Sequence, residues 1–240
     1  MTYSTNDDTR QHVPATLAGW GDNELLHGLH AQELEWLDKQ LEAFPLRPHA
    51  VLAKRGEVPD YVYFPSGGLV SIFSGRDGLR TEIGLLGREG ISAPVMVLGD
   101  KVAMHDYVVD VGGNCQRLPT TSFIAAVKRC PNLERRLHHY LANFVEQVGE
   151  SACIASLGSI EERLVRRLLM ASDRLETDGL AFTHEALAGA LCVRRPSVTL
   201  ALHVLEGRHL LRSQRGSIEI IDRPNLEALV QPYYAPPVIH

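Results

Sequence analysis

The sequence lacks any run of apolar residues long enough to cross a membrane. No apolar stretch approaches the ~20 residues that a bilayer-spanning helix needs. The first residues, Met1–Arg10, are polar and do not show the basic-then-apolar pattern of a secretory signal. We therefore expect a cytoplasmic protein with no membrane partner.

Cysteine is scarce and is not arranged for chemistry. Cys115, Cys130, Cys153 and Cys192 lie far apart and follow no metal or disulfide spacing. Each is expected to be a small buried residue, and the pattern reveals no redox role for any of them. No metal and no cofactor is predicted.

Positive charge is also in short supply, except in one segment. The 24 basic and 29 acidic residues give a formal net charge of −5, which argues against indiscriminate coating of nucleic acid. The segment from Arg194 to Arg215, however, contains five arginines and a single acid, Glu206, which gives a local charge of +4. Such a focused basic segment is typical of a specific nucleic-acid contact.

Residues 182–221 have the pattern of a winged helix-turn-helix. Thr183 can cap a first helix, whose short apolar face is formed by Leu187, Ala188 and Leu191. After a break at Cys192-Val193, a second helix is expected to begin at Arg194-Arg195-Pro196, where proline is well tolerated, and to end at Gly207. Two short strands joined through Gln214-Arg215-Gly216 follow. This order places the second helix where it can enter a DNA major groove.

Helical spacing divides the second helix into two faces. Val198, Leu202 and Leu205 face inward, so the outer face carries the residues predicted to contact base edges: Arg195, Pro196, Ser197, Thr199 and Leu200. An outward leucine suits a thymine methyl group. Phosphate contacts are predicted for His184, Arg194, His203, Arg212 and Arg215. The plainer alternative is a small helical hairpin with surface arginines.

The rest of the chain predicts an α+β protein. A loose arm (1–22) is followed by a helical pattern from Asn23 to Phe44. Several short strands separated by glycine-rich turns then indicate an antiparallel roll or barrel: Val51–Lys54, Tyr61–Phe64, Leu69–Ser74, Arg80–Leu86 and Tyr107–Val111. The predicted divisions are a roll (23–130), a dimerisation helix with hinge (131–158), a DNA-binding domain (159–230) and a loose tail (231–240).

A long helix is expected to begin at Pro131, after a short one over Thr120–Arg129. Its apolar residues recur at spacings of four and three, which predicts a parallel dimer interface formed by Leu137, Leu141, Phe144, Val148, Ser151 and Ala155. The same stripe could instead pack on the roll. Leu157-Gly158-Ser159 is a candidate hinge before a helix over Ile160–Leu175.

This order of elements resembles the Crp/Fnr family of bacterial transcription regulators, from about Glu33 to Leu229. Three stretches carry the resemblance: VLAKRGEVPDYVYFPSGGLVSIF (Val51–Phe73), SLGSIEERLVRRLLMASDR (Ser156–Arg174) and THEALAGALCVRRPSVTLALHVLEGRHLLRSQRGSIEIID (Thr183–Asp222). The resemblance implies a homodimer that binds palindromic double-stranded DNA, with RNA polymerase as a candidate partner. Of the family's base-reading Arg, Glu and Arg, only the first is kept here, as Arg195; Pro196 and Leu200 stand at the others. Cys192 replaces the turn glycine.

The sensor half departs further from the family pattern. In GREGISAPVMVLGDKVAMHDYVV (Gly87–Val109) no glutamate follows Gly90-Ile91, and Met104-His105-Asp106 occupies the place of the phosphate-binding arginine. Val148 and Gly149 stand where cAMP binders carry hydroxyl side chains. We therefore expect no response to cAMP, and the effector is unidentified. Residues 1–40 lack the cysteines of iron–sulfur members. His105 is a conceivable axial ligand for haem, and the plainer interpretation is a partly solvated loop histidine.

Two other functions fit parts of the sequence. The chain could be a regulator without a small ligand, controlled by its abundance or by a protein partner. A cupin-like metal enzyme would need paired histidines in the roll, where only His49 and His105 occur, 56 residues apart.

Overall fold

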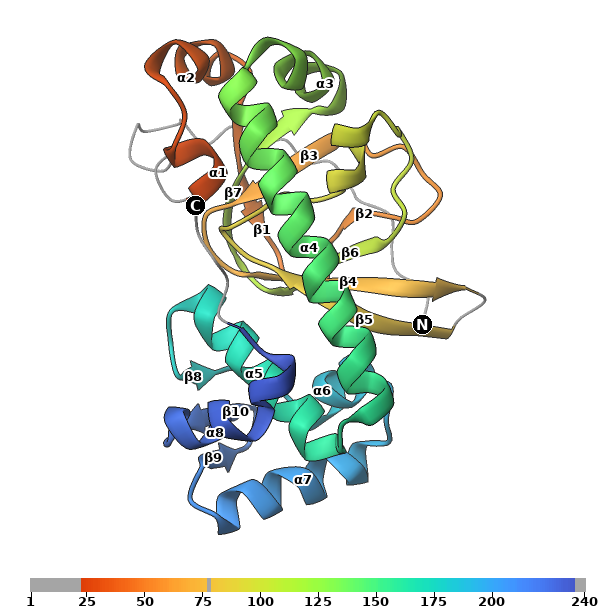
Figure 1. Ribbon diagram of the computed structural model, residues 1–240, viewed down its shortest axis with the longest axis vertical. Coiled ribbons are helices and arrows are strands. Elements are labelled where there is room, and N and C mark those ends of the chain that lie inside the picture. The colour runs from red at the N-terminus through yellow and green to blue at the C-terminus, as the bar shows by residue number, and fades with distance from the viewer. Residues whose placement is uncertain (1–22, 77–78, 236–240) are drawn as a thin grey trace.

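The computed structural model describes residues 23–76 and 79–235. The expected arm (1–22), residues 77–78 of one expected turn and residues 236–240 of the expected tail lie outside this range. Figure 1 shows a roll of strands above a smaller helical domain, with one long helix, α4, passing along both.

The roll consists of two antiparallel sheets. One has the order β1-β7-β3 and the other β2-β6-β4-β5. The strands of the first sheet are β1 (Glu42–Leu46), β3 (Tyr61–Pro65) and β7 (Gly113–Pro119). Those of the second are β2 (Val51–Ala53), β4 (Leu69–Arg76), β5 (Leu79–Leu86) and β6 (Asp106–Val111). A 3-10 helix, η1 (Pro94–Leu98), lies between β5 and β6. The five expected strands are present, and the antiparallel roll is confirmed.

The N-terminal segment differs from the expectation of helical structure over residues 23–44. Two short helices, α1 (Glu24–His27) and α2 (Ala31–Asp38), replace it. Gly28 caps the first, and β1 begins at Glu42. Residues 42–46 form a strand instead of a helix because β1 pairs with β7. Arg117 on β7 also forms an ion pair of 2.9 Å with Glu42.

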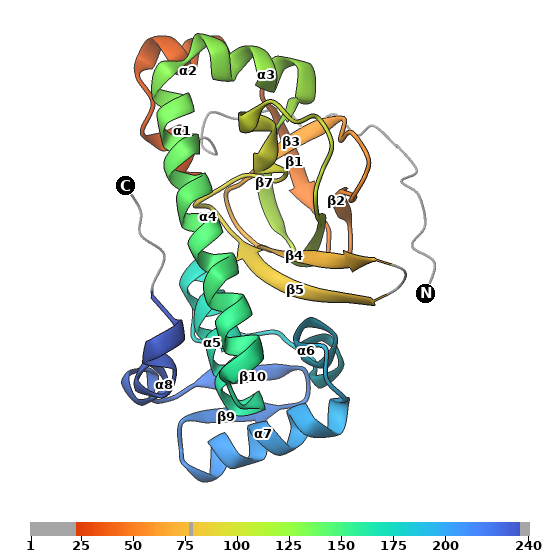
Figure 2. The ribbon, with the colours of Figure 1, turned by 45° about the vertical axis from the view of Figure 1, so that its right-hand side comes forward.

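Helices α3 (Thr120–Arg129) and α4 (Pro131–Leu157) follow the roll. The backbone N–H of Asn132 donates to the Glu33 carboxylate at 3.0 Å, so an acid from α2 caps the start of α4. Figure 2 shows α4 beside the roll and continuing down to the C-terminal domain. The face of α4 toward the roll is buried and comprises Leu133, Leu137, Tyr140 and Phe144.

The C-terminal domain begins after a break at Gly158. Ser159 and Glu162 form a reciprocal capping box that starts α5 (Ile160–Leu175). The remaining elements are β8 (Gly179–Leu180), α6 (His184–Leu191), α7 (Arg195–Gly207), β9 (Leu211–Gln214), β10 (Ser217–Ile220), α8 (Arg223–Val230) and η2 (Gln231–Tyr233). Leu69 and Leu85 of the roll belong to this domain's apolar core, so the two halves pack directly together.

Candidate nucleic-acid interface

The turn between α6 and α7 has the geometry that the sequence predicts. The Thr183 hydroxyl accepts from the N–H of Ala186 at 3.1 Å and caps α6. Cys192, which ends α6, adopts a left-handed conformation with φ of 53°. A left-handed conformation costs a non-glycine residue roughly 1–2 kcal/mol, so the replacement of the turn glycine by Cys192 strains this turn.

Helix α7 presents an apolar ridge to solvent. Val198, Leu202 and Leu205 are buried beneath it. On the opposite face Leu200 is 64% exposed and Val204 is 42% exposed, while Arg195, Pro196 and His203 are exposed beside them. Val204 was not among the predicted contacts, although its place four residues after Leu200 could have revealed it.

Three predicted contacts are less accessible. Ser197 and Thr199 are half-buried. The Thr199 hydroxyl donates to the carbonyl oxygen of Arg195 at 3.2 Å. His184 lies with Nδ1 3.0 Å from that hydroxyl and Nε2 3.3 Å from the Ser213 hydroxyl. His184 therefore ties α6, α7 and β9 together, which makes it a positioning residue for the recognition helix.

A rim of arginines surrounds the ridge. Arg194, Arg208, Arg212 and Arg215 are all exposed. Arg212 forms an ion pair of 3.0 Å with Glu219, so part of its charge is already balanced. The single acid of the segment, Glu206, accepts from the backbone N–H of Ser213 at 2.6 Å and thereby fixes β9 against α7. An apolar ridge with a cationic rim matches a groove floor flanked by phosphates.

The predicted dimer seam divides between two faces of α4. Leu137 is fully buried and Phe144 is 9% exposed within the single chain, because both pack on the roll. Leu141 and Val148 are half-buried, and Ser151 donates to the carbonyl oxygen of Gln147 at 2.8 Å. Ala155 is exposed. Leu137 and Phe144 therefore serve the core of the roll and offer no surface to a partner.

A second stripe on α4 is exposed along its length. It also recurs at spacings of four and three, and it consists of His138, Ala142, Val145, Gly149, Ala152 and Ser156. Val145 is 68% exposed. Five of the six residues are small or apolar, which is unusual for a surface facing water.

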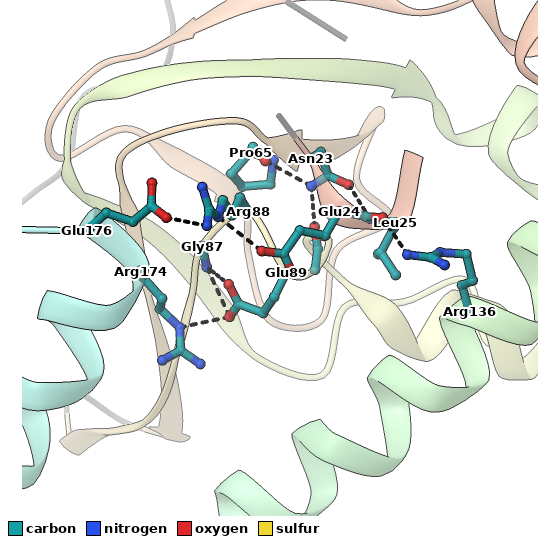
Figure 3. Close-up of polar contacts among 11 residues, drawn as sticks. Asn23, Glu24, Leu25, Pro65, Gly87, Arg88, Glu89, Arg136, Arg174 and Glu176 are labelled. Atoms are coloured by element: carbon teal, nitrogen blue, oxygen red, sulfur yellow. Dashed lines mark hydrogen bonds and ion pairs between the residues drawn. The ribbon is translucent and has the colours of Figure 1, made fainter. Parts of the chain in front are cut away.

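The turn at Gly87–Gly90, which follows β5, is occupied by internal contacts (Figure 3). Glu89 accepts from the N–H of Gly87 at 3.0 Å and from Arg174 of α5 at 2.7 Å. Arg88 pairs with Glu24 at 3.0 Å and also with Glu176. This turn thus joins the roll to the C-terminal domain.

Aromatic side chains fill the space between this turn and α4. Tyr140 and Phe144 stack with centroids 6.4 Å apart, and His105 meets Phe144 edge-on at the same distance. A Cβ on Gly90 would lie 2.1 Å from the Tyr140 ring, so the contact is tight. Desolvation, followed by the nearby charge of Arg55, lowers the pKa of His105.

A buried ion network connects the roll to α5. Arg167 bonds Glu82 at 2.9 Å and Asp110 at 2.6 Å, and its guanidinium lies over the Phe182 ring. Arg166 pairs with Glu150 at 3.0 Å. Sequence reasoning missed both arginines. The sequence could have indicated their burial, because both arginines stand between Val165 and Leu168 on the apolar face of an amphipathic helix.

The cysteines divide into two pairs. Cys115 and Cys130 are buried as predicted, whereas Cys153 and Cys192 are exposed, which corrects the prediction for these two. Burial raises the pKa of the Cys115 thiol to about 12. Within residues 23–76 and 79–235, no group of three His, Cys, Asp or Glu side chains could hold a metal ion. None of the described helices is long and apolar enough to span a membrane.

Comparison with known proteins agrees with this geometry. Residues 162–229 match the family model of the Crp-like helix-turn-helix domain. No curated protein matches the sequence. A Crp-family transcriptional regulator from Thermus thermophilus is similar in structure, with 18% identity, a TM-score of 0.63 and coverage of 81% of this chain and 98% of that chain.

Two further solved structures have the same fold. FixK2 from Bradyrhizobium japonicum is 17% identical, with a TM-score of 0.64 and coverage of 79% of this chain and 96% of that one. The c-di-GMP-responsive regulator CLP from Xanthomonas campestris is 14% identical, with a TM-score of 0.65 and coverage of 80% and 99%. The structural similarity, at these low identities, establishes the fold. Together with the domain match, they confirm the resemblance predicted from the sequence.

Proposed function

We propose that this chain is a transcription regulator of the Crp/Fnr type and that it works as a homodimer that reads a near-palindromic DNA site. The observation that carries the proposal is α7, whose exposed face combines Arg195 and the ridge of Pro196, Leu200 and Val204 with a rim of arginines. Base edges are read by the ridge and by Arg195, and phosphates are held by the rim.

The base sequence of the proposed DNA half-site follows from these side chains. Arg195 suits guanine, which offers two acceptors in the major groove. Leu200 and Val204 have no hydrogen-bonding groups and suit thymine methyl groups. We therefore propose a half-site in which a guanine is followed by thymines. Arg194, Arg212 and Arg215 supply affinity that does not depend on sequence and falls with salt.

We further propose that the exposed stripe on α4 forms the dimer interface. A parallel pair of helices buries a four-three stripe, and the small residues Ala142, Gly149 and Ala152 permit close approach of two backbones. Each residue of this stripe follows by one position a residue of the seam that the sequence predicted. It brings two copies of α7 to one side of the dimer.

The sensor is proposed to respond to a signal other than a cyclic nucleotide. Three observations support this: the region corresponding to the phosphate ligand holds Met104-His105-Asp106, Asp106 already accepts from the N–H of Arg55 at 2.8 Å, and Tyr140 packs on Gly90. Titration calorimetry with cAMP and cGMP tests the point. We expect no heat of binding at micromolar concentrations, and a micromolar constant for either nucleotide would contradict it.

The experiment that tests the main proposal is selection of random DNA duplexes by the purified full chain. We expect enrichment of inverted repeats that contain guanine and thymines. Arg195→Ala should lose the guanine from the consensus, while the control Arg47→Ala, at an exposed arginine of the β1–β2 turn, should recover the wild-type consensus. Recovery of random sequence by the wild-type chain would overturn sequence-specific binding.

A further inference from the structure

His184 is held by side chains from two other elements of the proposed DNA-binding surface. It is the first residue of α6, and Figure 2 shows α6 and β9 above α7. Nδ1 of its ring lies 3.0 Å from the hydroxyl oxygen of Thr199 on α7, and Nε2 lies 3.3 Å from the hydroxyl oxygen of Ser213 on β9. The side chain is half-buried. Both ring nitrogens are therefore paired with neutral hydroxyl groups.

The hydroxyl of Thr199 decides which ring nitrogen carries the hydrogen. It donates its single hydrogen to the carbonyl oxygen of Arg195 at 3.2 Å, so it can only accept from His184. Nδ1 of His184 is therefore the donor in this pair. In a neutral imidazole Nε2 then has no hydrogen, and it accepts from the hydroxyl of Ser213.

A second proton on the ring would reverse only the contact with Ser213. A charged imidazole donates from both nitrogens, so Ser213 changes from donor to acceptor and its hydroxyl hydrogen becomes available to another acceptor. The backbone N–H of Ser213 stays bonded to Glu206 at 2.6 Å. The same arrangement of heavy atoms thus suits both the neutral and the charged form of His184.

Charged and titratable side chains on the three elements complete the surroundings of His184: Glu185 on α6, Arg195, His203 and Glu206 on α7, and Arg212 on β9. Arg212 is paired with Glu219 at 3.0 Å. In the proposed complex, phosphates approach the N-terminal end of α7, to which His184 is tied through Thr199 and Arg195. Charges interact over roughly 8–10 Å at physiological salt, so bound DNA favours a positive charge on His184.

We propose that His184 takes up a proton from the solvent when the chain binds DNA. The proton adds to Nε2, the ring gains one positive charge, and the hydroxyl of Ser213 turns its hydrogen toward a phosphate oxygen. DNA is therefore bound more tightly as the pH falls through the range in which histidine changes charge, about pH 8 to about pH 5. This inference rests on the proposed DNA-binding function and adds a proton-linked residue to the same surface.

Isothermal titration calorimetry of the full chain with a duplex recovered by selection counts the protons. Binding heats measured at one pH in two buffers of different ionisation enthalpy differ in proportion to the number of protons taken up. We expect net uptake near neutral pH. His184 contributes at most about one proton per protomer, so it raises the affinity by at most about tenfold per pH unit for each protomer.

His184→Gln retains hydrogen-bonding groups for both hydroxyls but cannot take up the proton. It should bind DNA with a smaller proton count and a flatter pH dependence than the wild type. The matched control His30→Gln, at an exposed histidine before α2, should keep the wild-type count. A count that is equal in the wild type and in His184→Gln would overturn the proposal. So would a pH dependence that survives in His184→Gln and disappears in His203→Gln, because the proton would then belong to His203.

Nuclear magnetic resonance of the histidine rings gives a readout that does not depend on how well the variant folds. The ring ¹³C and ¹⁵N shifts distinguish the two neutral tautomers from the charged form. In the free chain at alkaline pH, His184 should carry its hydrogen on Nδ1, and DNA added near neutral pH should convert the ring toward the charged form. A neutral ring with its hydrogen on Nε2, or a ring spectrum that DNA leaves unchanged, would contradict the proposal.

This inference and the proposed function fail in different ways. Absence of DNA binding at every pH removes the proposed function and the proton uptake with it. Specific DNA binding with a proton count that does not depend on His184 removes the proton uptake alone.

Discussion

At the scale of single residues, the proposed recognition helix α7 is notable for the side chains that its outward face lacks. Its outward face has one arginine at the N-terminal end and then Pro196, Leu200 and Val204, so no carboxylate or amide on the ridge can read adenine or cytosine. In the proposed complex, base discrimination therefore comes mainly from one bidentate contact and from methyl groups. The arginine rim would contribute affinity that does not depend on sequence.

Arg195 and Arg215 should therefore behave differently when replaced by alanine. Arg195→Ala should cost about 1–3 kcal/mol on the preferred site and flatten discrimination at one base pair. Arg215→Ala should weaken all sequences alike and lower the salt slope by about one unit. Binding curves for single-base site variants at two salt concentrations distinguish them. If Arg195→Ala weakens every variant equally, Arg195 is only a phosphate contact.

Leu200 can be tested one methyl group at a time. Replacing the contacted thymine with deoxyuridine removes only its 5-methyl group, and it should cost about 0.8 kcal/mol per half-site. Leu200→Ala should remove most of this difference, whereas Arg195→Ala should preserve it. Fluorescence anisotropy on matched duplexes measures the effect. Unchanged affinity for every thymine-to-deoxyuridine duplex would mean that the ridge does not read methyl groups.

Arg167 is predicted to be the most sensitive residue of the domain junction. Arg167→Met would leave Glu82 and Asp110 buried without their cation, and breaking such a pair typically costs about 3–5 kcal/mol. Urea denaturation should show a lower midpoint than the wild type. Arg163→Gln, one turn away and half-buried, should change the midpoint little. A midpoint for Arg167→Met equal to that of the wild type would mean that the network adds no stability.

At the scale of elements, sequence periodicity identified the helices better than it identified their partners. Helix α4 has two stripes with the same four-three spacing, and the one with the larger side chains packs on the roll because it buries more apolar area. The pattern alone could not separate core from interface, which is why Leu137 and Phe144 were assigned to the dimer. Helices α3 and α5 and the strands with glycine-bounded turns were predicted because their signals are local.

Elements whose stability depends on distant partners were missed. β1 contains Pro45 and Glu42, and β7 contains Asn114, Gln116 and Arg117, so neither has an alternating apolar pattern. They form strands because they pair with each other and because β7 also pairs with β3. On α7, exposure of Leu200 and burial of Val198 followed from the helical period, whereas the contact of His184 with Thr199 and Ser213 depends on three elements meeting.

The exposed stripe on α4 predicts a disulfide that crosses the dimer axis. In a background of Cys153→Ser and Cys192→Ser, Val145→Cys should form a cross-linked dimer on mild oxidation, because facing core positions of a parallel pair bring the two Cα atoms within disulfide range. The neighbouring change Glu146→Cys points away and should stay uncross-linked. Non-reducing electrophoresis measures the fraction of cross-linked dimer. Cross-linking through Glu146→Cys but not Val145→Cys would place the interface on another face.

At the scale of the molecule, the two halves are joined by charge as well as by packing. Arg167 and Arg174 reach from α5 to carboxylates of the roll, Arg88 reaches from the roll to Glu176, and Leu69 and Leu85 enter the C-terminal core. A displacement of the roll would therefore change the orientation of α7. In a dimer, two copies of α7 held in this way fix the distance between the half-sites they read.

The most direct test of a two-fold symmetric reader is a change in half-site spacing. Half-sites recovered by selection should lie about one helical turn apart, ~34 Å. Inserting five base pairs between them turns one half-site to the opposite face of the duplex. We predict that this insertion reduces the affinity of the full chain to that for a single half-site, and that ten base pairs restore contact only in part. Equal affinity for the original and the five-base-pair insertion would contradict a homodimer that reads both half-sites at once.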